Sequence, residues 1–187
     1  YFAVHFRPIM IVIGLLYFVF DHVMTLLFLL NAGLVLASVP LCYLARKILR
    51  HDGMALIIGV LYLTNVFTRS IHLALHIEAL VPLGFFLLFL AFEKRNSLLL
   101  LMTMFFLFSN KEDIPLYTFG ISFMFLISHY FTKEKDQWVF KNMMTVLIMS
   151  VVFFIIANVS IEFAGTDQLN AVGISPLEKF GSIGDSK

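Results

Sequence analysis

The sequence has few of the residues on which soluble and disulfide-bonded proteins depend. Only 13% of its 187 residues are charged, whereas charged residues make up about a quarter of an ordinary soluble domain. The single cysteine, Cys42, excludes an internal disulfide and a cysteine-based metal cluster. The formal net charge is only +1, so the charge balance indicates no nucleic-acid partner.

Sequence signatures of common enzymes are missing as well. We find no arrangement typical of a Ser-His-Asp triad, no phosphate-binding loop, no dinucleotide fingerprint and no HExxH zinc motif. The chain begins with Tyr1 and shows no signal peptide. We therefore interpret it as a piece of a longer protein or as a processed product.

Apolar residues dominate what is present. They make up 60% of the chain and include 22 phenylalanines, and they surround each predicted helix instead of forming one stripe, as expected for helices in lipid. The sequence predicts an all-α polytopic membrane protein with a transmembrane domain over 1–163. A short interfacial helix is expected at about 8–20, followed by membrane segments at about 23–45, 54–68, 77–92, 97–110, 114–131 and 139–161. The polar stretch 164–187 is predicted to be an extracytoplasmic loop or the start of a further segment.

Basic residues alternate from loop to loop. The loops near 46–51, 93–96 and 132–137 carry most of them: Arg46, Lys47, Arg50, Lys94, Arg95, Lys133 and Lys135. The intervening loops carry only Arg69 and Lys111. Because short loops rich in Lys and Arg stay in the cytoplasm, we expect the intervening loops and the tail to face outward.

The most informative stretch is Lys111-Glu112-Asp113, between two apolar runs. As a helix, the preceding segment 97–110 covers about 21 Å of a hydrocarbon core about 30 Å thick, so these charges are expected near membrane depth, where they indicate a functional site. The carboxylates could hold a metal, orient a hydroxyl or act as a general base, and Lys111 could bind a phosphate. The alternative is a tight turn at the headgroups, and we also expect Asp113 to cap the helix that follows.

Two further groups lie on the same predicted face. Arg69, His72 and His76 share one stripe of a helix, where the histidines could bind a divalent ion or simply lie at the lipid–water boundary. Glu78 could accept a hydrogen bond from Arg69 or Lys111, or it could coordinate a cation. Alternatively, it is simply a negative charge at the N-terminus of a helix. Near the start of the chain, His5 and Arg7 either anchor the chain end or present an imidazole and a guanidinium suited to a phosphate.

The order of these motifs resembles a family of prokaryotic membrane proteins catalogued as domain of unknown function 2079, which is grouped with the GT-C membrane glycosyltransferases. The resemblance is carried by His5-Phe6-Arg7-Pro8-Ile9, Leu75-His76-Ile77-Glu78-Ala79-Leu80, Lys111-Glu112-Asp113 and the tail segment Lys179 to Ser186. The family usually has Ser in place of Arg7 and often Pro in place of Ile77. The resemblance implies the middle of a GT-C-like transmembrane helix bundle in a prokaryotic plasma membrane, without the acidic residue that such enzymes carry in their first external loop.

The resemblance also implies an activity, the transfer of a sugar from a polyprenyl-phosphate carrier to an extracytoplasmic acceptor. In this hypothesis the catalytic residues are Glu112, Asp113 and Glu78. The substrate-binding residues are His5, Arg7, Arg69, His76 and Lys111. A divalent cation, if the site uses one, is assigned to His76, Glu78 and Asp113. The alternatives are a membrane transporter or flippase and a non-catalytic scaffold subunit.

One geometric prediction connects these groups. If they form one site, then Lys111, Glu112 or Asp113 must come within one water-bridged contact of the segment 76–78. The entry at His5 to Arg7 must lie beside the same cavity, because charges at membrane depth turn toward each other and away from lipid.

Overall fold

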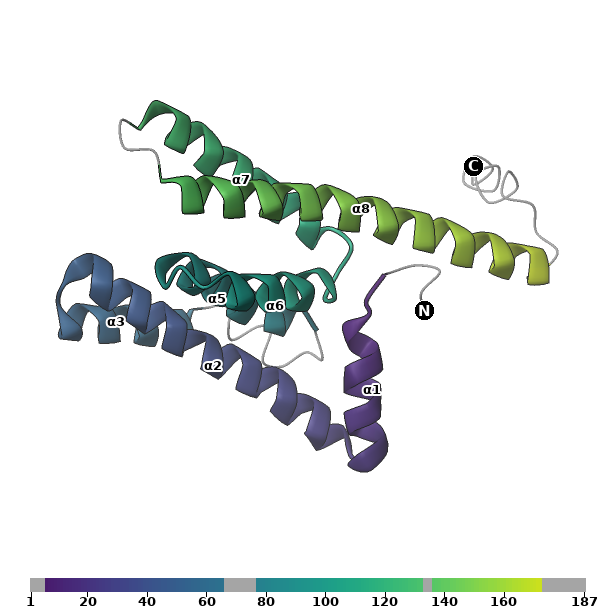
Figure 1. Cartoon of the computed structure of the whole chain (residues 1–187). Helices are drawn as coiled ribbons and strands as arrows, with labels where there is room; N and C mark the ends of the chain where they lie inside the picture. The colour runs from purple at the N-terminus through teal and green to yellow at the C-terminus, as the bar shows by residue number, and fades with distance from the viewer. Residues whose placement is uncertain (1–5, 66–76, 133–135, 173–187) are drawn as a thin grey trace, which may run out of the picture.

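The computed structural model describes residues 6–65, 77–132 and 136–172, and every regular element in this part of the chain is helical (Figure 1). The elements are α1 Ile9–Val19, α2 Val23–Leu49, α3 Asp52–Thr64, the 3-10 helix η1 Ile77–Leu80, α5 Val81–Glu93, α6 Ser97–Phe108, α7 Ile114–Phe131 and α8 Gln137–Val172. The prediction of an all-α membrane bundle is confirmed.

The helices fall into two length classes. Within α2, α7 and α8, the stretches Met24–Leu49, Ile114–Phe131 and Gln137–Phe163 are long and apolar enough to cross a membrane. The helices α1, α3 and α6 are apolar but shorter, and the 12 residues of α6 extend only about 18 Å. Large apolar side chains are widely exposed, for example Phe18 at 87% and Phe131 at 79%, as expected for a surface in contact with lipid.

The end of α8 differs from the prediction. The sequence predicts a segment that ends at 161 and, from 164, a loop or the start of a further segment, whereas α8 continues without a break to Val172. Most residues after 163 are compatible with a helix, and the single glycine in this stretch, Gly165, costs only about 1 kcal/mol there. A polar composition therefore marked the end of the apolar span and not the end of the helix.

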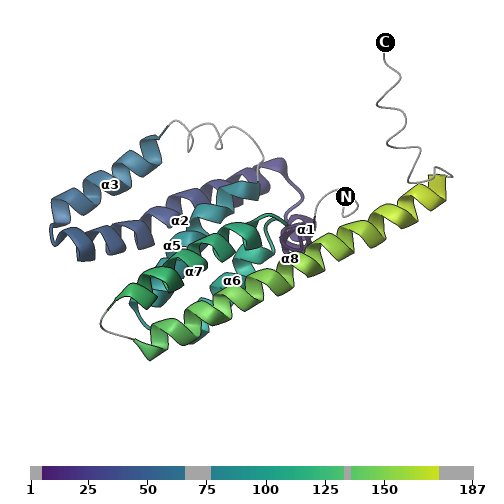
Figure 2. The same cartoon turned by 90° about the horizontal axis from the view of Figure 1, so that it is seen from above.

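Three antiparallel hairpins stack on one another: α2 with α3, α5 with α6, and α7 with α8 (Figures 1 and 2). Between the second and third hairpins lies one apolar core, formed by Leu88, Ala91, Leu100, Met104, Leu107, Phe108, Ile114 and Val146. The third hairpin also has a buried hydroxyl contact, 2.8 Å between Thr118 Oγ1 and Ser150 Oγ. Such interhelical hydrogen bonds help to hold helices together in lipid, where no hydrophobic force does so.

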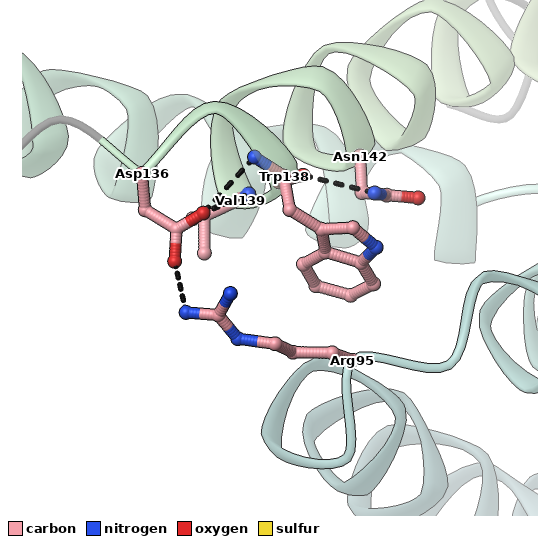
Figure 3. A network of polar contacts seen from close by, with 5 residues as sticks. All are labelled: Arg95, Asp136, Trp138, Val139 and Asn142. Atoms are coloured by element: carbon pink, nitrogen blue, oxygen red, sulfur yellow. Dashed lines mark hydrogen bonds and ion pairs between the residues drawn. The ribbon is translucent and has the colours of Figure 1, made fainter.

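The helix ends that flank the three basic loops lie at one end of this bundle (Figure 1), which we call the basic end. Lys47, in the last turn of α2, forms an ion pair with Glu93, the last residue of α5, and this contact joins the ends of the two helices. Arg95 forms an ion pair with Asp136, at the start of α8, whose other carboxylate oxygen accepts from the N–H of Trp138 at 3.0 Å (Figure 3). These contacts bring the helix ends beside the basic loops together. Lys133 and Lys135 lie outside the described residues, and the cytoplasmic orientation of the loops stays a prediction.

The first helix lies at the opposite end. There α1 runs across the bundle, near the start of α2 and the end of α6 (Figure 1). Its buried face belongs to a second apolar core that includes Ile9, Ile13, Leu30, Leu34, Ile77, Ala79 and Leu80. Gly33 of α2 permits this packing, because a Cβ there would lie 2.3 Å from Leu80 Cδ2. The short helix η1 is therefore held directly against α2.

Candidate functional site

The site candidates gather at the end of the bundle that α1 crosses. The Ile9 N–H donates to the carbonyl oxygen of Ser109 at 2.9 Å, so the start of α1 is joined to the end of α6. Ser109 Oγ and Asn110 Nδ2 both donate to the carbonyl oxygen of Phe106, at 2.8 and 2.6 Å. These side chains satisfy an orphan carbonyl and end α6. The connection 109–113 therefore lies beside the residues that precede α1.

An ion pair joins the residues before α1 to η1. Arg7 Nη2 donates to Glu78 Oε1 at 2.8 Å, although 71 positions separate the two residues in the chain. Their side chains are only 11% and 33% exposed, and the residues flanking Glu78 in η1 are buried. The predicted convergence of the Arg7 and Glu78 segments is thus confirmed. From the sequence, Arg69 and Lys111 were the expected donors to Glu78, and Arg7 was not expected in this role.

A second pair lies in the connection between α6 and α7. Lys111 Nζ is 3.1 Å from Asp113 Oδ2, with both side chains about one-third exposed. The hydrogen bond to Asp113 raises the pKa of Lys111 above its usual value. The negative charges of Asp113, Glu78 and Glu112 raise it further, and partial burial opposes them. Carboxylates of the 111–113 segment and of η1 therefore both influence the charge of Lys111. We call Arg7, Glu78, Lys111, Glu112 and Asp113 the polar cluster.

The predicted cap at Asp113 is wrong in its chemistry. Asp113 occupies the N-cap position of α7, but its side chain makes no capping hydrogen bond and its backbone is helical, with φ −88° and ψ −17°. A capping side chain normally requires an extended backbone at that position. Pro115, in the first turn of α7, also removes one of the N–H groups that a cap would satisfy. The carboxylate is therefore directed to Lys111.

Three buried polar atoms at this end have no hydrogen-bond partner within the described part of the chain: Arg7 Nε, Asn110 Oδ1 and Asp113 Oδ1. An unsatisfied buried group costs about 1–3 kcal/mol, so a set of them indicates that water or a ligand binds there. Asn110 is 1% exposed and sequence reasoning did not select it. Its position directly before Lys111, at the end of a short apolar segment, was the signal that could have identified it.

An apolar cavity of about 250 Å³ lies beneath α1. Its walls come from α1, α2, η1, α5 and α6, and they include Ile9, Ile13, Gly33, Leu36, Leu80 and Phe106. Ile9 lies two positions after Arg7, and Leu80 two positions after Glu78. Two residues of the polar cluster are therefore close in the chain to residues that line this apolar cavity, which we call the α1 groove.

Comparison with known proteins places the chain in a family. The family whose model matches residues 1–187 is described as Predicted membrane protein (DUF2079). The chain belongs to this family. No curated protein and no solved structure matches it. Membership agrees with the spanning-length helices α2, α7 and α8 and makes the chain an integral membrane protein.

The remaining predicted site residues cannot all be placed. His5, Arg69, His72 and His76 lie outside the described residues. Over the described ranges 6–65, 77–132 and 136–172, no group of three or more His, Cys, Asp or Glu side chains could hold a metal ion. The predicted metal set includes His76, so that assignment stays a prediction.

Proposed function

We propose that this chain is part of an integral membrane glycosyltransferase, which moves a sugar from a polyprenyl-phosphate carrier to an acceptor on the extracytoplasmic side of a prokaryotic plasma membrane. The observation that carries this proposal is the combination of the polar cluster with the α1 groove. A lipid-linked sugar phosphate has the same division into a charged, hydroxyl-rich head and an apolar chain. The apolar polyprenyl chain would lie in the α1 groove, and the sugar-phosphate head would contact the buried polar atoms.

The polar cluster and the adjacent Asn110 have groups for each part of such a head. Arg7 Nε and Lys111 would hold the phosphate, because a guanidinium and an ammonium both form charge-assisted hydrogen bonds with phosphate oxygens. Asn110 Oδ1 and Asp113 Oδ1 are acceptors and would take hydrogen bonds from sugar hydroxyls. His5, Arg69 and His76 stay candidates for the same binding role.

The reaction would use a carboxylate as general base. Glu112, Asp113 or Glu78 would take the proton of the acceptor hydroxyl as its oxygen forms a bond to the anomeric carbon. The bond from that carbon to the phosphate oxygen breaks, and the phosphate of the carrier leaves with the electron pair, held by Arg7 and Lys111. Direct displacement of this kind inverts the anomeric centre. A divalent cation held by His76, Glu78 and Asp113 would neutralise charge on the same phosphate.

A series of isosteric variants tests the assignment. Full-length protein carrying Glu78→Gln, Glu112→Gln or Asp113→Asn would be assayed for turnover of a polyprenyl-phosphate-linked sugar. We expect a loss of about 10²-fold or more in the variant that removes the base. Asp52→Asn is a matched control, because Asp52 is an exposed carboxylate at the basic end. Wild-type-like transfer by all three variants would contradict the assignment.

The same charges could serve a transporter or flippase, and the same bundle could serve a scaffold. A transporter would move the intact lipid or solute across a liposome membrane without cleaving the sugar phosphate. A scaffold would do neither. Product analysis in proteoliposomes therefore separates the three functions.

A further inference from the structure

A second cavity lies at the basic end, far from the polar cluster along the bundle. It has a volume of about 700 Å³ and lies between the last turns of α7 and the first turns of α8. Its lining residues in the described part of the chain are Leu126, His129, Tyr130, Gln137, Phe140 and Lys141. The walls therefore combine apolar surface with four polar groups: the ammonium of Lys141, the amide of Gln137, the imidazole of His129 and the phenol of Tyr130.

Lys141 is the basic residue that lines this cavity, and within the described part of the chain it forms no ion pair with a carboxylate, unlike Arg46, Lys47 and Arg95. Arg46 pairs with Asp52 at 2.6 Å, and Lys47 and Arg95 pair with Glu93 and Asp136. Lys94 lies over the Tyr43 ring, 5.2 Å from its centroid. No ion pair or side-chain hydrogen bond of Lys141 is found among the described residues. An unpaired ammonium beside a cavity is suited to bind an anion.

The position of the cavity limits the kinds of anion that can reach it. Both walls belong to helices that are long and apolar enough to span a membrane, and the cavity lies where they join at the basic end. Aromatic side chains lie at the same end of the bundle as the cavity. Tyr130 is exposed, and Trp138 contacts Phe92 with ring centroids 5.9 Å apart. Trp and Tyr are typical of the headgroup level of a bilayer. Basic residues at this level attract anionic lipids.

We infer that this cavity binds the headgroup of an anionic phospholipid from the surrounding bilayer. Lys141 Nζ pairs with the phosphate, and Gln137 and Tyr130 are positioned to hydrogen-bond headgroup oxygens. The acyl chains continue along the apolar wall of Leu126 and Phe140. This site is independent of the proposed glycosyltransferase function, because it shares no residue with the polar cluster or the α1 groove.

The test uses the full-length protein in detergent with phosphatidylglycerol or phosphatidylcholine added, and native mass spectrometry counts the lipids retained. We expect retained phosphatidylglycerol but not phosphatidylcholine, and a weakening of about fivefold or more in Lys141→Gln. Arg50→Gln is the matched control, because Arg50 is an exposed cation at the same end that does not line the cavity. It should retain phosphatidylglycerol as the wild type does.

A second variant separates the cavity from the charge. Leu126→Trp keeps Lys141 and fills the apolar wall, so it should also lose the retained lipid while the protein keeps its melting temperature. Equal retention of both lipids by the wild type would overturn the inference. Equal losses in Lys141→Gln and Arg50→Gln would also overturn it, because they would indicate attraction by the basic end as a whole.

Discussion

The contact between Arg7 and Glu78 allows a sharp test of how the polar end is held together. Glu78→Gln keeps the size of the side chain and one oxygen acceptor but removes its charge. Loss of one partner from a buried ion pair costs about 3–5 kcal/mol, whereas exposed pairs contribute less than about 1 kcal/mol. Since the two side chains are 11% and 33% exposed, we expect an intermediate loss, about 2 kcal/mol.

The assay is thermal unfolding of the full-length protein in one detergent, followed by circular dichroism. A loss of this size corresponds to a decrease in Tm of about 4–8 °C by the scaling of domains of similar length. Asp52→Asn is the matched control, because it removes a pair of similar distance, 2.6 Å, whose side chains are 67% and 76% exposed. That control should change Tm by less than about 2 °C.

The double variant Arg7→Gln with Glu78→Gln makes the test specific to the pair. If the ion pair stabilises the start of α1 against η1, the two single losses will not add, because each variant removes the same contact. Additive losses, or equal effects of Glu78→Gln and Asp52→Asn, would refute the reasoning that burial gives this contact its strength.

Two further predictions concern packing and pH. Gly33→Ala should destabilise the protein by about 1–3 kcal/mol, because the new Cβ would lie 2.3 Å from Leu80 Cδ2; Gly14→Ala, with nothing within 4 Å, should be neutral or stabilising in the same thermal assay. Because the pKa of Lys111 is raised from 10.5, its charge contributes stability at lower pH, and this contribution is lost as pH rises through the raised pKa. The difference in Tm between wild type and Lys111→Gln should therefore stay constant at neutral pH and shrink only above about pH 10, and a difference that disappears near pH 8 would contradict the assignment.

The sequence predicted those features that one chain segment determines alone. Apolar runs determine where α2, α7 and α8 lie, and the alternation of basic loops predicted that the helix ends beside them lie at one end of the bundle. The length of the run 9–20 also predicted a first helix too short to span. These features depend on local composition and on the bilayer as a solvent.

The sequence predicted that the segments of Arg7 and Glu78 converge, but it did not predict the individual contacts between them. The partner of Glu78 depends on how α1 docks, which in turn depends on the Ile9–Ser109 hydrogen bond and on the packing of Ile13 against α2. The periodicity of apolar residues in the sequence does not reveal how α1 docks or which residue pairs with Glu78. Asp113 was expected to cap α7 because capping is the common local role of aspartate, and the nearby lysine determined its contact instead.

The measurement that tests the central claim most directly is the fate of the sugar–phosphate bond. Full-length protein in proteoliposomes would be given a polyprenyl-phosphate-linked sugar with a labelled sugar and a soluble acceptor. We predict release of free polyprenyl phosphate together with labelled acceptor, and loss of both products in at least one of Glu78→Gln, Glu112→Gln and Asp113→Asn but not in Asp52→Asn. Movement of the intact lipid across the bilayer without release of polyprenyl phosphate would contradict the account.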